Sequence, residues 1–415
     1  MGIQINGQTD IISATDGSLT VSGADLPNAT NLNVSGVTTT ATLRATSIVG
    51  VTTAGITTAY IGSINDGPLS GARNRIINGD MRIDQRNAGV STTPANGTYT
   101  LDRWNGQSGG ASSKYSIQQN AGSVTPPVGF TSYIGATSLS AYTPASGDWF
   151  GIEQRIEGNN ISDFAFGTSS AKTITLSFWV RSSLNGTFGG SLYNDTGNRS
   201  YPFTYFISSI NTWEYKIITI PGDTSGTWQT GTGIGLQVIF SLGASSSLQG
   251  TAGSWASSLF RTATGTTNVV ATNGATFYLT GVQLEVGTVA TPFERRSFGQ
   301  ELALCQRYYQ KSYELNTAIG TNTSNGRTFM VGRCTGTYVD YGNTIFFPVR
   351  MRSQPTMKFY TQTGTADSWF NTSGTNPNPS YNNRSEGEFS LYVTDATTAG
   401  QAGFMYGHWT SSAEL

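Results

Sequence analysis

The residues able to perform acid–base or nucleophilic chemistry are few and widely spaced in this sequence. His408 is the single histidine among 415 residues, so any Ser-His-Asp or Cys-His catalytic arrangement would depend on this one side chain. The chain contains no G-x-S-x-G, Walker A or H-E-x-x-H motif. Two cysteines and one histidine cannot form a structural zinc site without carboxylates. We therefore expect no cofactor, no metal site and no enzymatic activity.

Glycoside cleavage is the one reaction that this composition could still support, because it needs only two carboxylates at a fixed separation in a groove. Two pairs are close in sequence, Asp148 with Glu153 and Glu386 with Glu388. Their spacing does not place either pair across a groove, and solvation of the surface is the ordinary role of such carboxylates. Cleavage is therefore kept as an alternative.

Sugar binding suits the available residues better. A pyranose ring has an apolar face that stacks on Trp or Tyr, and its hydroxyls pair with amides, carboxylates and backbone groups. The C-terminal candidates for glycan contact are Trp369, Tyr381, Asn382, His408 and Trp409. In the body of the chain, Tyr142 and Trp149 lie among Gly, Ser and Pro residues that predict loops. Core packing is the alternative for each aromatic residue, and we expect it for Trp179, Trp213 and Tyr215, which lie inside strand patterns.

The segment 281–310 marks a change of pattern. Its first part alternates as a strand does, with Val282, Leu284 and Val286 on one face. The period then becomes about 3.6, which predicts one short helix over 297–313 that begins with a capping box of Ser297 and Gln300.

The predicted helix has an apolar stripe, Phe298, Leu302, Cys305 and Tyr309. This stripe could contact other copies of the chain in a trimer, or it could cap the preceding domain within one chain. Cys305 lies on the stripe and is expected to be a buried thiol, although one bridge to Cys334 stays open.

The remaining sequence predicts an all-β protein in three regions. Residues 67–296 contain many short alternating runs separated by Gly, Asn and Ser, which predicts a jelly-roll β-sandwich. Residues 314–415 predict a C-terminal β-sandwich tip with a long polar loop, 367–388. Residues 1–66 repeat short β-like units with glycines 13 and 14 apart, which indicates either a β-structured shaft that needs several copies or a Thr-rich disordered linker.

The composition limits the classes of molecule that we expect this protein to bind. Charged residues make up 11% of the chain, against roughly 25% in average globular proteins. The formal net charge of -1 provides no attraction to phosphate backbones, so nucleic acid is not expected as a partner. Arginines at 73–103 alternate with aspartates, which favours structural ion pairs over an anion site. No apolar run approaches the ~18 residues needed to span a bilayer, and the N-terminus lacks a signal-peptide pattern.

Two segments carry a resemblance to a known family. They are RNRIINGDMRIDQRNAG with YTLDRW in 73–104, and GVQLEVG, ATPFERR and ELALCQRYYQ in 281–310. Together they resemble passages in tail-fibre and related virion proteins of tailed bacteriophages. The segment FFPVRMRSQPTMKFY and the closing SSAEL resemble the terminal domain of such fibres.

The resemblance implies a jelly-roll body like that of carbohydrate-binding modules, a homotrimer, and a place in the virion tail after synthesis in the host cytoplasm. It implies attachment to other virion proteins through the N-terminal region and recognition of a host surface polysaccharide by the distal end. Two alternatives remain: a non-adhesive head decoration or baseplate component, and a tail-spike polysaccharide depolymerase.

Overall fold

The computed structural model describes residues 72–340, 344–374, 376–394 and 398–415. The predictions for 1–66, a β-structured shaft or a linker, fall outside the described residues.

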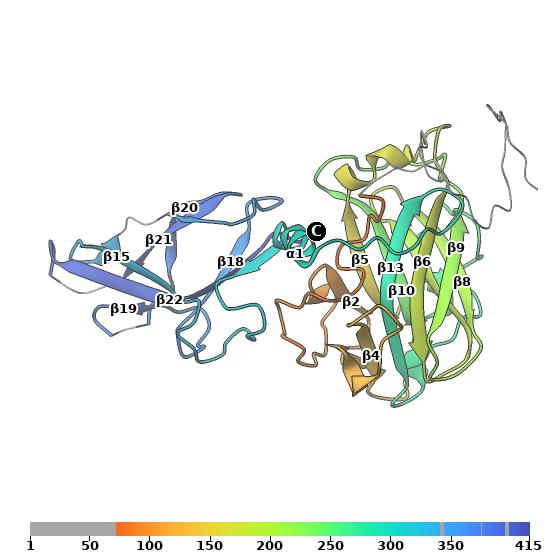
Figure 1. Cartoon of the computed structure of the whole chain (residues 1–415), viewed down its shortest axis with the longest axis horizontal. Coiled ribbons are helices and arrows are strands. Elements are labelled where there is room, and N and C mark those ends of the chain that lie inside the picture. The colour runs from red at the N-terminus through yellow and green to blue at the C-terminus, as the bar shows by residue number, and fades with distance from the viewer. Residues whose placement is uncertain (1–71, 341–343, 375, 395–397) are drawn as a thin grey trace, which may run out of the picture. The chain divides into compact units, whose positions relative to one another are not determined.

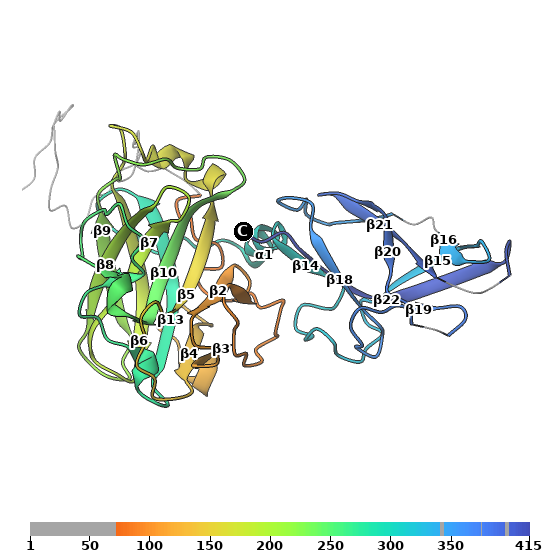
Figure 2. The same ribbon diagram turned by 180° about the vertical axis from the view of Figure 1, so that it is seen from behind.

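Two antiparallel sheets form the body of the protein (Figures 1 and 2). The six-stranded sheet has the order β1 (Thr98–Leu101), β2 (Trp104–Gly109), β5 (Trp149–Glu157), β10 (Ile234–Ala244), β7 (Gly186–Asn194), β8 (Arg199–Ile207). The five-stranded sheet has the order β3 (Tyr115–Gln119), β4 (Ile134–Ser138), β13 (Thr276–Val286), β6 (Ile174–Ser182), β9 (Glu214–Ile220). A short parallel pair, β11 (Gln249–Gly250) and β12 (Thr262–Ala263), packs near β7 and β8.

The core of the body lies between these sheets, as the alternating runs predict. On β6, every second side chain from Ile174 to Val180 is fully buried. On β13, Val282, Leu284 and Val286 face the same core. The body is therefore a jelly-roll β-sandwich of the predicted kind. Five single-turn 3-10 helices lie in its loops, at Ala121–Ser123, Gly158–Asn160, Ser162–Phe164, Ser246–Leu248 and Val269–Ala271.

One strand faces the opposite way from the prediction. Tyr215 and Ile217 on β9 are 40% and 54% exposed, whereas Glu214 and Lys216 are half-buried and form an ion pair at 2.6 Å. The register of β9 explains this reversal, because Ile218 and Ile220 on the face of Glu214 pack against the core. The carboxylate of Glu214 is satisfied there by the backbone amides of Ser208 and Ser209. Trp179 and Trp213 are half-buried on the outward side of the same sheet, so the core interpretation is wrong for Tyr215 and only partly met for the two indoles.

A single α-helix, α1 (Phe298–Gln306), occurs among the described residues, and it is shorter than predicted. Ser297 and Gln300 form the expected capping box. The chain leaves the helix at Arg307 and enters strand β14 (Tyr309–Lys311), because the backbone of 309–311 pairs with a strand of the tip.

The apolar stripe of the helix is used largely within the chain. Cys305 is fully buried beside Ile77 and Ile83, and Tyr309 lies in a strand and is 4% exposed. Leu302 packs partly on the same cluster, and Phe298 alone is exposed, at 43%. Cys305 and Tyr309 therefore cannot serve as trimer contacts in this conformation. Cys305 and Cys334 are both free buried thiols.

The C-terminal tip has its own core and one continuous nine-stranded sheet rather than two separate sheets. Its path is β14, β22 (Ala402–Ser412), β15 (Thr328–Cys334), β16 (Tyr338–Asp340), β21 (Glu388–Thr394), β17 (Ile345–Phe346). Strands β18 (Thr356–Tyr360) and β19 (Phe370–Asn371) also pair with β22, and β20 (Ser380–Arg384) pairs with β21. The predicted loop 367–388 contains β19 and β20. Within the described ranges, no helix has the length and apolar character that crossing a bilayer requires.

Candidate functional site

Three of the predicted glycan contacts belong to the core of the tip. Trp369 is fully buried, and its indole N–H donates to the carbonyl of His408 at 2.8 Å. Trp409 is 6% exposed, and its indole N–H donates to the hydroxyl of Thr328 at 2.9 Å. No face of either indole is open to a pyranose ring, because each ring packs edge-on against buried Phe side chains.

His408 is buried by the loop that follows β14. Its imidazole stacks on the Tyr313 ring with 3.8 Å between the ring centroids, and Nδ1 lies 3.1 Å from the Ser312 hydroxyl. Burial lowers the pKa of His408 from its usual value. The imidazole is therefore a neutral group at pH 7 that is packed inside the tip in this conformation.

Tyr381 is the remaining predicted contact whose side chain the structure describes, since that of Asn382 lies outside the description. Tyr381 is 36% exposed and the Arg384 guanidinium lies 4.6 Å from its ring centroid. In the body, Tyr142 and Trp149 are half-buried. Tyr142 donates to Asp148, and Arg261 lies 4.7 Å from the Trp149 ring centroid, so both rings already have partners.

Both members of the carboxylate pair Asp148 and Glu153 are bonded within the chain. Asp148 accepts from the Tyr142 hydroxyl at 2.5 Å and from the Ala145 amide at 2.9 Å. Glu153 is fully buried and accepts from Arg155 at 2.7 Å. Glu386 and Glu388 lie at the surface of the tip, where Glu386 faces Arg350 at 3.5 Å.

A row of buried polar side chains crosses the outer face of the six-stranded sheet. Gln107 links Trp149 to Asn105, and Asn105 donates to Glu153 at 3.4 Å. Oε2 of Glu153 has no hydrogen-bond partner among the described residues. Because these side chains are covered by the chain itself, the row stabilises the sheet face and does not present a site to a ligand.

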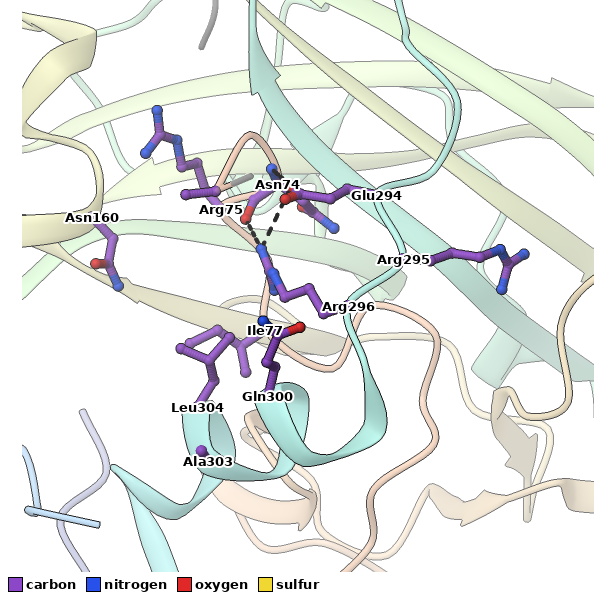
Figure 3. A pocket seen from close by; sticks show the side chains of 11 residues that line it. Asn74, Arg75, Ile77, Asn160, Glu294, Arg295, Arg296, Gln300, Ala303 and Leu304 are labelled. Atoms are coloured by element: carbon purple, nitrogen blue, oxygen red, sulfur yellow. Dashed lines mark hydrogen bonds and ion pairs between the residues drawn. The ribbon is translucent and has the colours of Figure 1, made fainter. Parts of the chain in front are cut away.

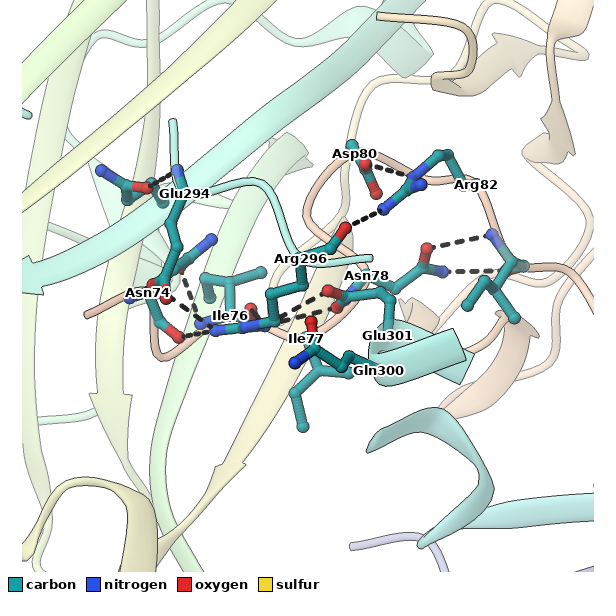
Figure 4. Close-up of polar contacts among 12 residues, drawn as sticks. Asn74, Ile76, Ile77, Asn78, Asp80, Arg82, Glu294, Arg296, Gln300 and Glu301 are labelled. Carbon is teal, nitrogen blue, oxygen red and sulfur yellow. Dashed lines mark hydrogen bonds and ion pairs between the residues drawn. The ribbon is translucent and has the colours of Figure 1, made fainter. Parts of the chain in front are cut away.

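The two segments that carry the family resemblance meet in the structure (Figure 4). Asn74 donates through Nδ2 to the carbonyl of Val282 at 3.0 Å and accepts through Oδ1 from the amide of Leu284 at 3.1 Å. Arg296 bonds to the carbonyls of Asn74 and Ile76, as Figure 4 shows. These contacts fix the 73–104 segment against β13 and the approach to α1. We call this joint the seam.

Charged groups complete the seam by pairing inside it. Glu301 on α1 accepts from the amide of Asn78 and faces Arg296 at 3.4 Å. Arg82 pairs with Asp80, which confirms structural ion pairing for this part of the predicted arginine cluster. A buried charge is tolerated only when it is paired in this way.

The end of the chain closes the seam. Glu414 accepts from both Arg86 and Arg103, and the Arg103 side chain is only 1% exposed. Nearby, burial alone would raise the pKa of Glu157, but hydrogen bonds from Arg307 and Tyr308 outweigh this effect and lower it. The sequence pattern could not reveal Glu414 or Glu157 as partners, because each is more than 140 residues from the arginine that it binds.

A pocket of about 630 Å³ opens at the seam (Figure 3). Its floor is apolar, with Ile77, Ala303 and Leu304, and polar side chains surround it, including Asn160 and Gln300. Figure 3 shows that Arg296 is already bonded to Asn74 at one side of this pocket. The pocket therefore offers apolar contact and amide hydrogen bonds, and one of its three lining arginines, Arg296, is already bonded within the chain.

A second pocket, of about 430 Å³, lies on the tip beside the predicted carboxylate Glu388. The side chains that line it are Phe346, Phe347, Arg350, Ser385 and Glu388. Phe346 is 70% exposed, which is the largest exposure of any aromatic side chain named here. The sequence did not single out Phe346, because the segment 344–349 predicts a strand without showing which face of it is open.

The tip also exposes an apolar face that the sequence did not reveal. Phe329 and Val331 on β15 are 49% and 55% exposed, and they pair across β22 with Tyr406 and Phe404. Phe370 on β19 stacks on Tyr406 with 4.9 Å between centroids. We call these five side chains the tip face. Their rings stack on one another, so mainly their edges point outward.

Comparisons with known proteins add the following. No protein-family model matches the chain, and no curated protein matches its sequence. The enzymatically active domain of bacteriophage CBA120 tailspike protein 4 is similar over 52% of this chain and 21% of that chain, at 12% identity and a TM-score of 0.28. The present chain thus spans about a fifth of that tailspike structure.

Two carbohydrate-binding modules are similar to about half of the chain. One is the family 11 module from Clostridium thermocellum in complex with a β-1,3-1,4-mixed-linked tetrasaccharide (49% of this chain, 99% of that chain, 13% identity, TM-score 0.24). The other is the CBM22-1 xylan-binding domain of Paenibacillus barcinonensis Xyn10C (49% of this chain, 99% of that chain, 14% identity, TM-score 0.21). At these identities the likeness concerns the fold alone.

Proposed function

We propose that the protein is a tail-fibre protein of a tailed bacteriophage, a virion structural component that binds a host surface glycan during adsorption. The contacts of the seam are the main observation that supports this proposal. The two sequence segments that resemble tail-fibre proteins lie about 200 residues apart, yet they bond to each other through Asn74, Arg296 and Glu301. The two segments that carry the resemblance therefore form one structural joint between the sandwich and the tip.

The low charge and the polar uncharged surface suit an adhesive role. In this role the N-terminal region attaches to other virion proteins, and the tip meets the host polysaccharide. Neither nucleic acid nor insertion into a membrane enters this function. No cofactor, metal ion or catalytic residue is required, because adhesion needs contact and no bond cleavage. The protein is made in the host cytoplasm and acts in the virion tail.

A homotrimer fits this role, because three linked heads gain avidity from individually weak sugar contacts. The surface that supports the trimer differs from the predicted helix stripe. The tip face gathers exposed and half-exposed apolar side chains on one side of the tip, and Phe298 is exposed on α1, whereas Cys305 and Tyr309 are packed within one chain. Stacked rings whose edges point outward suit protein packing better than a sugar, which needs an open ring face.

Adsorption measurements test the function directly. The purified full chain is expected to bind host cells, to compete with phage for adsorption, and to lose binding when surface polysaccharide is stripped from the cells. It is expected to release no oligosaccharide from that polysaccharide, and release would instead favour a depolymerase. Retained phage adsorption in the presence of saturating protein would oppose the adhesive role.

A further inference from the structure

We propose that the tip pocket beside β17 binds a single neutral pyranose unit of the glycan, with Phe346 under the ring and Glu388 accepting from its hydroxyls. This inference rests on the proposed adhesive function and adds the subsite and the class of sugar. The pocket volume of about 430 Å³ lies within the range of small-molecule sites.

The aromatic element of the site is Phe346. It is the residue directly opposite Glu388 in the β17–β21 pair, so both side chains lie on the same face of the sheet. No ring contact of Phe346 occurs within the described residues, and its exposed fraction of 70% leaves a face free for the C–H groups of a sugar. Its neighbour Phe347 is buried and anchors this segment in the core of the tip.

The polar element is a turn whose shape is fixed before any ligand arrives. Ser385 donates through its amide to the carbonyl of Glu388 at 2.9 Å, and its hydroxyl accepts from the amide of Gly387 at 3.2 Å. The carbonyl of Gly387 accepts from the amide of Phe347 at 2.9 Å, which joins the turn to the aromatic strand. A preorganised turn reduces the entropy lost on binding.

Glu388 is the hydrogen-bond acceptor in this site. Its Oε1 accepts from the side-chain amide of Asn383 at 2.9 Å, and no bond to Oε2 occurs within the described residues. A carboxylate oriented by one amide can accept from sugar hydroxyls through its other oxygen. Arg350 is 75% exposed at the rim and can donate to a ring or hydroxyl oxygen.

Charge selects the class of sugar. Glu388 lines the pocket, and the guanidinium of Arg350, the lining arginine, is already faced by Glu386 at 3.5 Å. A uronate carboxylate would be repelled, whereas a neutral hexose would keep every hydrogen bond described above. The seam pocket is a poorer candidate because no aromatic side chain lines it, so it offers no ring on which a pyranose could stack.

The test uses the full chain and measures binding of the methyl glycosides of glucose, galactose and mannose, and of glucuronate, by saturation-transfer NMR and calorimetry. At least one neutral glycoside is expected to bind, and glucuronate more weakly. Phe346→Ala and Glu388→Gln are each expected to weaken binding roughly ten-fold, the loss of one charged hydrogen bond or one stacking contact. Phe206→Ala and Glu314→Gln are matched controls at exposed positions outside the pocket and are expected to bind as the unmodified chain does.

Each outcome has a defined meaning. If a neutral glycoside binds and both pocket variants bind it unchanged, the pocket is not the subsite, while adhesion by the protein stands. Tighter binding of glucuronate overturns the choice of a neutral sugar. If the unmodified chain binds neither these glycosides nor host cells, the adhesive function fails and this subsite fails with it.

Discussion

The guanidinium of Arg103 lies 3.6 Å from the centre of the Tyr308 ring. Arg103 belongs to the first segment that resembles tail-fibre proteins, and Tyr308 belongs to the second. This stacking therefore joins the two segments within the seam. The same guanidinium binds Glu414. The seam is thus a buried, charged joint in which each group depends on partners from distant parts of the chain.

Removing Glu414 should therefore destabilise the protein strongly. The change Glu414→Gln leaves Arg103 and Arg86 without their carboxylate in a buried site, and loss of one partner of a buried pair costs about 3 kcal/mol or more. Urea unfolding monitored by near-ultraviolet circular dichroism measures this loss. Glu314→Gln, at an exposed position that forms no ion pair with the described residues, should change the unfolding free energy by less than about 0.5 kcal/mol. Equal effects of the two changes would show that the Glu414 ion pairs add nothing.

Trp369 should behave as a core residue and not as a sugar contact. Trp369→Ala removes a fully buried indole and should lower the unfolding free energy of the tip by roughly 3–5 kcal/mol. Trp369→Phe keeps most of the volume and should cost less. Tryptophan fluorescence during thermal unfolding reports both. An alanine variant that keeps full stability and loses only glycan binding would instead support a direct contact between Trp369 and the glycan.

Acid should weaken the tip through His408. Burial lowers its folded pKa below the unfolded value of about 6.5. The unfolded chain then binds the extra proton first, so this group's contribution to stability is complete above pH 6.5 and declines as pH falls through the folded pKa. Because His408 is the only histidine, the difference between the unmodified chain and His408→Gln isolates the effect.

The unmodified chain must be compared with His408→Gln because the contribution of another buried group to stability changes with pH in the opposite direction. Burial raises the pKa of Asp102 to about 6, so its contribution is complete below about pH 4 and is lost as pH rises towards 6. Unfolding free energies of both chains at pH 5.5 and 7.5 provide the measurement. A difference that does not change between these two pH values would contradict a neutral, buried His408.

The tip face should control association between copies. Phe329→Glu places a charge among exposed rings, so the variant should keep its fold while losing the trimer. Sedimentation equilibrium gives the mass of each species. Phe206→Glu introduces the same charge at an apolar residue that is 58% exposed on β8, and it should leave the trimer intact. Trimers that persist in the Phe329 variant would move the interface elsewhere.

The sequence pattern allowed strands to be located, but it did not show which side chains of a strand would be exposed. The short alternating runs in 67–296 correspond to strands such as β6 and β10, because strands buried on one face carry a regular apolar pattern. The same pattern at 213–217 gave the wrong face, because the register of β9 places Ile218 and Ile220 against the core and turns Tyr215 and Ile217 outward. Capping residues located the start of α1, but the pairing of 309–311 with β22 ended the helix early.

Site residues were harder to predict for a related reason. Trp369 and Trp409 stand among Ser, Thr, Asn and Gly in sequence, which suggests exposure, yet long-range strand pairing with β22 encloses both. Phe346 and Phe329 look like ordinary strand residues, and their exposure depends on which side of the sheet receives the core. The partners that decide burial are often tens to hundreds of residues away, so local patterns cannot identify them.

The location and copy number of this chain on intact particles test the central claim most directly. Immunogold labelling and cryo-electron microscopy of the virion, combined with quantitative mass spectrometry, measure both. A tail fibre should appear as a small number of trimers around the tail, with the C-terminal tip furthest from the particle. Many copies distributed over the head, or absence of the chain from the purified virion, would contradict the account.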